Sequence, residues 1–163
     1  MNVNLHLLNA SGSLNIFTKK VENSFREALN DISKKIKISD IDVVVYDNPH
    51  QTIPEFGMGG YAQSANLIFI PIDPKFSNLS KTIEHELKRT LAHEIHHCLR
   101  WRGPGYGKNL LEAIITEGLA DHFDLEINGG NSPIWSSALS KRQLEKLLVE
   151  AKKEFFNENY DHN

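Results

Sequence analysis

The 163-residue chain is long enough for one compact domain with a buried core. Hydrophobic residues make up 40% of it, charged residues make up 24%, and the formal net charge is -3, as in an ordinary soluble globular protein. This balance provides neither a basic surface for nucleic acid nor a cationic patch for an anionic membrane. We therefore expect neither kind of partner, and the sequence leaves the oligomeric state unknown.

The single cysteine and the N-terminal residues bear on the cellular compartment. Cys98 has no second cysteine to pair with, so no internal disulfide can form. Residues 1–17 lack the basic segment and the long apolar stretch of a signal peptide. No run of the chain approaches the length of about 18 apolar residues that a transmembrane helix needs. We expect a cytoplasmic protein.

The first half of the chain alternates between strand and helix patterns. In chain order we expect a strand at residues 3–8, an amphipathic helix at 16–37, a buried strand at 41–46, a flexible glycine-rich segment at 57–60 and a strand at 65–72. Pro71 cannot donate to a ladder of backbone hydrogen bonds. The strand at 65–72 is therefore expected at an edge of the sheet, or to end at this proline.

The second half of the chain shows only helical patterns. A helix is expected at residues 80–100, ended by the Gly-Pro-Gly run at 103–105. A second helix is expected at 110–126, where Asn109 and Glu112 have the spacing of a helix cap, and a third after Ser140, with Gln143 in the same position. Strands early in the chain and helices late in it predict an α+β fold.

The helix at 80–100 carries the motif His93-Glu94-x-x-His97. Residues four apart share one face of a helix, so two imidazoles one turn apart can reach the same zinc ion at about 2.0–2.1 Å. The intervening Glu94 reaches the water on the metal rather than the metal itself. The alternative is a solvated polar face with two histidines that bind nothing.

The next helix strengthens the prediction of a metal site. Glu117 and Asp121 lie one turn apart in a stripe of otherwise apolar residues, and a buried carboxylate without a partner is costly. Zinc and a zinc-binding imidazole are suitable partners: Glu117 is expected to be the third ligand, and Asp121 to accept the far ring N–H of a ligand histidine. Gly118 is expected to let the two helices approach closely. The alternative is that both carboxylates flank a solvated groove.

These residues resemble a known arrangement. The HExxH motif at 93–97, followed by EGLAD at 117–121, is similar to the gluzincin site of thermolysin-like metallopeptidases, in which two histidines and a downstream glutamate bind zinc and an aspartate supports one histidine. The longer pattern HEIHH…LLEAIITEGLADHF resembles more specifically the YjaZ-like bacterial family of predicted zinc-dependent proteases. This similarity covers about residues 88–124.

The resemblance implies a zincin-like fold, in which a small mixed sheet has an edge strand over the active-site helix and a helical C-terminal part follows. It implies a single metallopeptidase domain over residues 1–163, with one Zn2+ per chain and a peptide or protein substrate. The family carries a further C-terminal helical segment with a Gly-Tyr motif, which is absent from this chain up to Asn163. The two alternatives are that this member of the family lacks the segment and that the sequence is shortened.

The expected reaction is hydrolysis of a peptide bond by a zinc-activated water, with Glu94 as general base, because three protein ligands leave one zinc position open. An extended peptide is expected to pair with the free edge of strand 65–72, with Asn66 and Ile68 as contacts. Tyr106, in the loop between the two helices, is a third candidate for substrate binding, against the alternative of a solvated surface loop.

Two other functions are compatible with these residues. The chain can be a non-catalytic regulatory or interaction domain that retains a zinc site. A di-iron carboxylate protein is the second alternative, because Glu94 and His97 form one Glu-x-x-His pair. Such a centre needs a second pair on another helix, and the sequence contains none.

Overall fold

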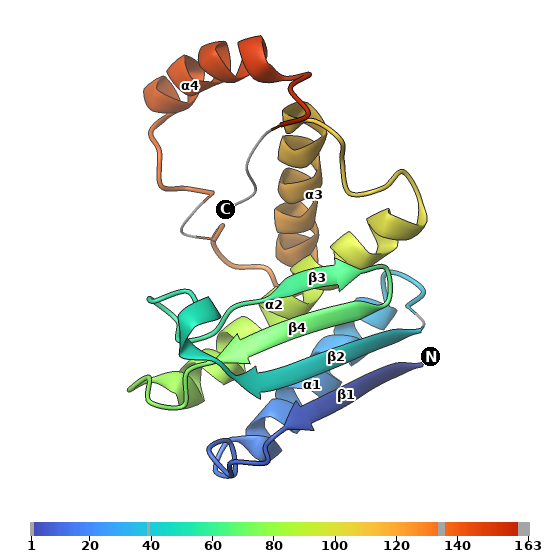
Figure 1. Cartoon of the computed structure of the whole chain (residues 1–163), viewed down its shortest axis with the longest axis vertical. Helices are drawn as coiled ribbons and strands as arrows, with labels where there is room; N and C mark the ends of the chain where they lie inside the picture. The colour runs from blue at the N-terminus through green and yellow to red at the C-terminus, as the bar shows by residue number, and fades with distance from the viewer. Residues whose placement is uncertain (1, 39, 134–135, 160–163) are drawn as a thin grey trace.

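The computed structural model describes residues 2–38, 40–133 and 136–159, and within them the fold is α+β, as predicted (Figure 1). The strands are β1 (Val3–Leu8), β2 (Ile41–Asp47), β3 (Tyr61–Ser64) and β4 (Leu67–Ile72). The helices are α1 (Thr18–Ser33), the short 3-10 helix η1 (Pro49–Gln51), α2 (Leu79–Arg102), α3 (Leu110–Asn128) and α4 (Lys141–Glu154). None of the described helices is long and apolar enough to cross a lipid bilayer.

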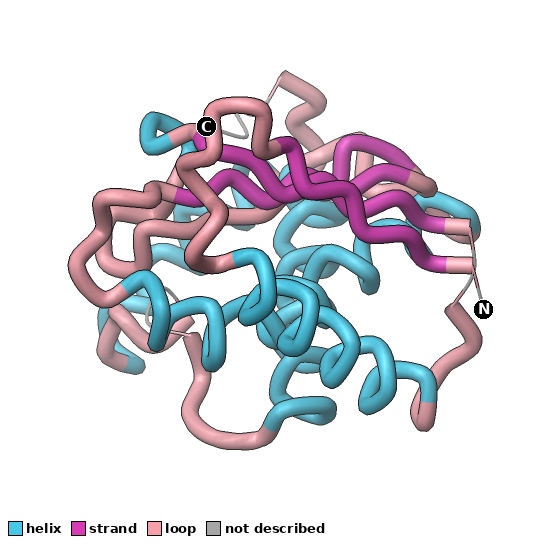
Figure 2. Tube along the Cα trace, turned by 90° about the horizontal axis from the view of Figure 1, so that it is seen from below, coloured by secondary structure: helices cyan, strands magenta, loops and turns pink. Residues whose placement is uncertain are grey.

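The four described strands form one mixed sheet in the order β1-β2-β4-β3. β1 and β4 both run parallel to β2, whereas β3 pairs with β4 in the antiparallel direction. β2 alternates between buried and half-buried residues, as expected when one face of a sheet is covered and the other is partly open. Figure 2 shows helices gathered beneath the strands. The sheet and the helices thus form two layers.

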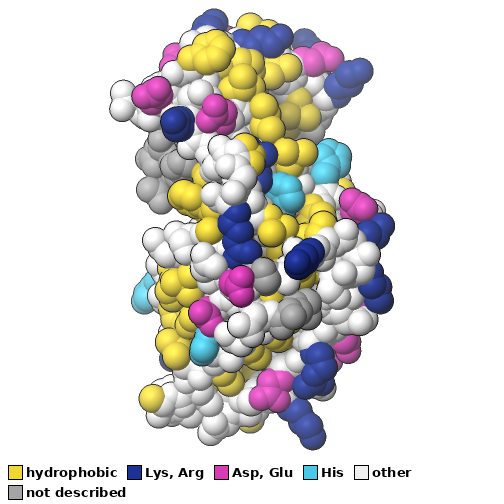
Figure 3. Space-filling model, turned by 90° about the vertical axis from the view of Figure 1, so that its right-hand side faces the viewer, with side chains coloured by type: hydrophobic (Ala, Val, Ile, Leu, Met, Phe, Trp, Pro, Cys, Tyr) yellow, Lys and Arg dark blue, Asp and Glu magenta, His cyan; other side chains and the backbone are white. Residues whose placement is uncertain are grey.

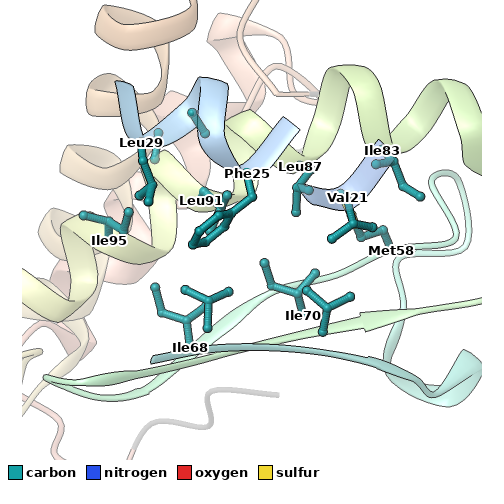
Figure 4. Packing of buried hydrophobic residues seen from close by; sticks show 14 of the residues in the cluster. Val21, Phe25, Leu29, Met58, Ile68, Ile70, Ile83, Leu87, Leu91 and Ile95 are labelled. Atoms are coloured by element: carbon teal, nitrogen blue, oxygen red, sulfur yellow. The ribbon is translucent and has the colours of Figure 1, made fainter. Parts of the chain in front are cut away.

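The hydrophobic core lies between the sheet and the helices α1 and α2. Apolar residues at steps of three and four along both helices point toward the sheet. The core side chains that meet in this layer include Val21, Phe25, Leu29, Ile68, Ile70, Ile83, Leu87, Leu91 and Ile95 (Figure 4). One face of α2 is therefore buried against the sheet and α1, and the opposite face can carry polar side chains.

Of the two alternatives predicted for strand 65–72, the edge position is wrong, whereas the strand does end at Ile72, one residue after Pro71. β4 lies inside the sheet between β2 and β3, and β3, which the sequence pattern did not predict, forms the edge. The carbonyl of Pro71 accepts from the N–H of Gly59, so the missing N–H of the proline faces the irregular segment before β3 and leaves the pairing with β2 intact. An interior strand thereby tolerates the proline.

The C-terminal helices are capped largely as the sequence predicts. The Asn109 side chain accepts from the N–H of Glu112 at the start of α3, and the Gln143 side chain accepts from the N–H of Ser140 before α4. The carbonyl groups of residues 155 and 157 accept from the first two N–H groups of α3, so the end of α4 satisfies donors that a helix N-terminus leaves unpaired. Figure 1 shows α4 arching above the sheet to this point.

α3 packs on α2 through a different stripe from the predicted one. Its buried residues are Ala113, Thr116, Ala120 and Asp124. A Cβ atom at Gly118 would meet nothing within 4 Å, so the prediction that this glycine allows close helix contact is wrong. Small residues elsewhere on α3, such as Ala113 and Ala120, face α2 instead. Ile114 is 45% exposed, and Figure 3 shows hydrophobic side chains at the surface of the upper part of the molecule.

Candidate metal centre

α2 and α3 bring three potential ligand atoms to one point. Nε2 of His93 lies 2.9 Å from Nε2 of His97 and 3.2 Å from Oε2 of Glu117, and the distance from Nε2 of His97 to Oε2 of Glu117 is 3.4 Å. The histidines are one turn apart on the face of α2 away from the core, and the connection from Gly103 to Asn109 turns the chain so that α3 faces them. The structure therefore brings together the three residues predicted as ligands.

The donor set and its spacing fit a zinc ion. Zinc favours imidazole nitrogen and carboxylate oxygen, and a tetrahedral ion with bonds of 2.0–2.1 Å holds its ligand atoms about 3.3 Å apart. The three atoms of the cluster lie 2.9, 3.2 and 3.4 Å from one another. A small outward shift of one imidazole would accommodate the ion, and the fourth side of the cluster faces a groove.

Asp121 supports one of the two histidines. Its Oδ1 atom lies 3.2 Å from Nδ1 of His93, the ring nitrogen that points away from the cluster. A carboxylate in this position fixes the ring orientation and leaves Nε2 free to bind a metal. His97 differs, because its Nδ1 atom is buried without a hydrogen-bond partner in the described part of the chain. The two ligands are therefore held by different means, one by a carboxylate and one by packing.

Tyr106, from the connection between the two helices, closes one side of the cluster. Its hydroxyl donates to Oε1 of Glu117, the carboxylate oxygen that does not face the histidines. Its ring lies 5.1 Å from the ring of His97, centroid to centroid, and its carbonyl accepts from the hydroxyl of the buried Thr116. The loop that carries Tyr106 is thus tied to α3 at two points rather than solvated.

The electrostatics of the cluster suit a cation. Burial raises the pKa of Glu117, but hydrogen bonds from His93, His97 and Tyr106 outweigh burial and hold it well below its usual range. Burial lowers the pKa of His93, yet the hydrogen bond to Glu117 and the charges of Glu94 and Asp121 bring it above its usual value. An excess of negative charge therefore surrounds the two imidazoles, as expected where a metal ion completes a site.

Glu94 is a buried carboxylate beside the cluster. It is 6% exposed, and burial raises its pKa despite the nearby histidines and a hydrogen bond from the backbone of Ala62 on the edge strand β3. A Cβ atom at Gly60 would lie 2.3 Å from Thr90 and 3.2 Å from Glu94, so the chain leading into β3 can approach α2 this closely only because residue 60 is glycine. β3 and α2 together hold the carboxylate in place.

An open groove of about 800 Å³ runs over the cluster. It is bounded on one side by Tyr61 and Ala62 of the edge strand and on the other by Trp101 and Tyr106. His93, Glu94, His97 and Glu117 also line it. A chain in extended conformation can therefore reach the cluster along β3.

Two predicted substrate contacts lie elsewhere. Ile68 is fully buried in the core, and Asn66 sits in the turn between β3 and β4, where its side chain donates to the carbonyl of Asp40. Both predictions depended on the wrong assignment of strand 65–72 to the edge. His96 and Cys98, which flank His97 in the sequence, are in buried surroundings. Burial lowers the pKa of His96 to about 4 and raises the pKa of Cys98 to about 12.

Comparison with known proteins gives one match. The profile of a protein family described as "Predicted Zn-dependent protease (DUF2268)" matches residues 21–163, and the chain belongs to this family. Searches of curated proteins and of solved structures found no significant match. The family description supports a zinc-dependent hydrolase with a peptide or protein substrate, and His93, His97 and Glu117 are the group of side chains in the described residues that would hold the ion.

Proposed function

We propose that the chain is a zinc metallopeptidase that hydrolyses peptide bonds, with His93, His97 and Glu117 as ligands. The observation that carries this proposal is the convergence of their three ligand atoms, no more than 3.4 Å apart, on the floor of an open groove. Three protein ligands and an accessible fourth side are the mark of a catalytic rather than a structural zinc site.

The side chains around the cluster have distinct tasks in this reaction. When bound, zinc supplies an activated water and polarises the scissile carbonyl group. Glu94 takes a proton from that water and delivers it to the leaving amine, a task for which its raised pKa is suitable. Asp121 keeps Nε2 of His93 directed at the metal, and Tyr106 orients Glu117 through its hydroxyl.

The substrate binds along β3 in this proposal. β3 is an edge strand of the sheet, and Ala62 lines the groove together with the residues of the metal cluster. An extended peptide that pairs with this edge would cross the metal cluster with its backbone. The peptide would therefore pair with β3 rather than with residues 65–72, which lie inside the sheet.

The proposal includes four more specific predictions about the type of site, the nearest family, the domain and the cellular location. The gluzincin arrangement, the closeness to the YjaZ-like proteins, a single zincin-like domain over residues 1–163 and a cytoplasmic location stay predictions. The order of ligands along the chain, HExxH on α2 and EGLAD on α3, supports the first of them. The single cysteine supports the last, because a protein without disulfides suits a reducing compartment.

Peptide cleavage by the zinc-loaded protein tests the proposal. The protein is incubated with a mixed peptide library, and the products are identified by mass spectrometry. We expect cleavage by the wild type and a rate lower by about 10²–10⁴-fold for Glu94→Gln, because that variant loses the general base and retains the ligands. Glu84→Gln, an exposed change on the same helix, is the matched control and should keep the rate.

The opposite results separate the alternatives. A wild type that binds zinc and cuts no peptide would be a non-catalytic zinc domain. A Glu94→Gln variant as fast as the wild type would remove Glu94 from the mechanism. Two iron atoms per chain in a metal assay would favour a di-iron centre.

A further inference from the structure

A second cavity opens from the groove beside the metal cluster. It has a volume of about 210 Å³ and shares Gly60, His93, Glu94 and Glu117 with the groove. From there it extends along α2 toward the N-terminus of the helix, past Thr90 and Arg89 to Glu86. A peptide lying over the metal would therefore have this cavity beneath one of the residues that flank the scissile bond.

The side wall of the cavity is apolar, and backbone hydrogen bonds hold the segment that forms it. Ile53, Phe56 and Met58 supply most of it. The segment is a tight turn, in which the N–H of Ile53 donates to the carbonyl of Met58 at 3.1 Å and the N–H of Gly57 donates to the carbonyl of Ile53 at 2.9 Å. Met58 is 2% exposed and also packs on the core (Figure 4). This wall suits the hydrocarbon stem of a long side chain.

The far end of the cavity carries one more negative than positive charge. Nη2 of Arg89 donates to Oδ2 of Asp124 at 2.6 Å and to the carbonyl of Asn131 at 3.0 Å, so Asp124 neutralises the guanidinium. Glu86, the remaining charged group, forms no hydrogen bond or ion pair within the described residues. Burial raises the pKa of Glu86; the charge of Arg89 opposes this rise, and the charge of Asp124 adds to it. Within the described part of the chain, Glu86 thus forms no ion pair with a cationic side chain.

The position of Glu86 matches the reach of a basic side chain. Glu86 precedes His93 by two turns of α2, which places it about 10 Å along the helix from the first metal ligand. A lysine or arginine whose backbone crosses the cluster can run its stem along the apolar wall and bring its charge to this carboxylate. An apolar side chain would fill the same space but would bury the Glu86 carboxylate further without a partner, which is costly.

We propose that this cavity binds a lysine or arginine side chain next to the scissile bond of the substrate, with Glu86 as the residue that selects it. The inference rests on the proposed function and narrows it to peptides with a basic residue at that position. An acidic side chain would meet Glu86 at the far end and is excluded by like charge.

The test uses two peptide hydroxamates that differ only in the residue next to the hydroxamate, which is lysine in one and norleucine in the other. Norleucine keeps the four-carbon stem and lacks the ammonium group. Binding to the zinc-loaded protein is measured by calorimetry, so the readout does not depend on catalysis. We expect the wild type to bind the lysine compound at least about tenfold more tightly, the effect of one charge-assisted contact.

Two variants assign the preference to its residue. Glu86→Gln should bind both compounds equally, whereas Glu84→Gln, an exposed change on the same helix, should retain the wild-type preference. Zinc content measured on each variant confirms that the site is intact. A wild type that binds norleucine as tightly as lysine, or a Glu86→Gln variant with an unchanged preference, would overturn the assignment. If neither compound binds the zinc-loaded wild type, the proposed function fails, and this inference fails with it.

Discussion

The two helices that make the metal cluster are anchored very differently. α2 lies on the core, and residues such as Leu87 and Leu91 are fully buried between the sheet and α1. α3 meets α2 through small residues and leaves Ile114 and Leu119 more than 40% exposed. The rigid helix supplies two ligands and the general base, and the more loosely packed helix supplies the third ligand. In this arrangement a bound metal ion would join the two parts of the molecule.

The largest effect should follow from removal of the ligand on α3. Zinc should raise the melting temperature of the wild type, because an ion that binds only the folded state stabilises it. Glu117→Ala should abolish this rise, since it detaches α3 from the metal. Calorimetric scans with and without zinc measure the effect, and Glu126→Ala, an exposed change on the same helix, is the control. An equal rise in Glu117→Ala would show that the ion binds elsewhere.

Truncation of one leucine on α2 and one on α4 should compare the packing of the core with that of the C-terminal helix. Leu91→Ala on α2 should lower the free energy of unfolding by about 2–5 kcal/mol, because it leaves a cavity in the core. Leu147→Ala on α4, where the side chain is 53% exposed, should change it by less than about 0.5 kcal/mol. Denaturant titrations supply both values. Similar losses at the two sites would mean that α4 is as firmly packed as the core.

Loss of the Asp121 carboxylate, which holds the His93 ring from α3, should lower the affinity for zinc less than loss of a ligand does. Asp121→Asn keeps the size of the side chain but removes the charge that holds Nδ1 of His93. The affinity for zinc should fall by about 10–100-fold, as for other residues that orient a ligand histidine. Competition with a chromophoric chelator gives the constant. An unchanged affinity would mean that packing alone orients the ring.

Protons should compete with zinc at the junction of the two helices. Burial lowers the pKa of His93, but the hydrogen bond to Glu117 and the charges of Glu94 and Asp121 raise it above the usual value. Since a ligand histidine must be deprotonated, the affinity for zinc should be complete above this pKa and should fall as the pH drops through it. Chelator competition from pH 8 to pH 5 tests the sign. Affinity that rises on acidification would contradict the assignment of His93.

The smallest effect on zinc affinity is expected from Tyr106, in the loop between α2 and α3. Tyr106→Phe removes the hydroxyl that donates to Glu117 and keeps the ring beside His97. Loss of one hydrogen bond is worth about 0.5–1.5 kcal/mol, so zinc affinity should fall only a few-fold. The chelator assay resolves such a change. A loss as large as that of Glu117→Ala would make Tyr106 a structural requirement of the site.

Much of the metal cluster was predictable because its signal is local. The one-turn spacing of His93 and His97 places both rings on one helix face in any fold, and Asn109 marks the start of the helix that carries Glu117. Two carboxylates in one stripe of otherwise apolar residues need partners, which indicated Glu117 and Asp121 before their contacts were known. The confirmed α+β class followed from the same local periodicities.

The errors concern arrangement in space. The order of strands in a sheet is not encoded within any one strand, so Pro71 suggested an edge that β3 in fact forms. α3 has apolar residues on several sides, including Ile114 and Ile115, and its hydrophobic pattern could not identify the buried stripe of small residues. The cavity that ends at Glu86 joins α2 to the turn at residues 53–58, a contact with no counterpart in local sequence.

X-ray absorption at the zinc edge, on protein loaded with one equivalent of zinc, identifies the atoms that bind the ion. If His93, His97 and Glu117 hold the zinc, the spectrum should show two imidazole nitrogen ligands together with oxygen ligands at about 2.0–2.1 Å, and His97→Ala should lose one imidazole. A spectrum with sulfur ligands, or one that His97→Ala leaves unchanged, would contradict it.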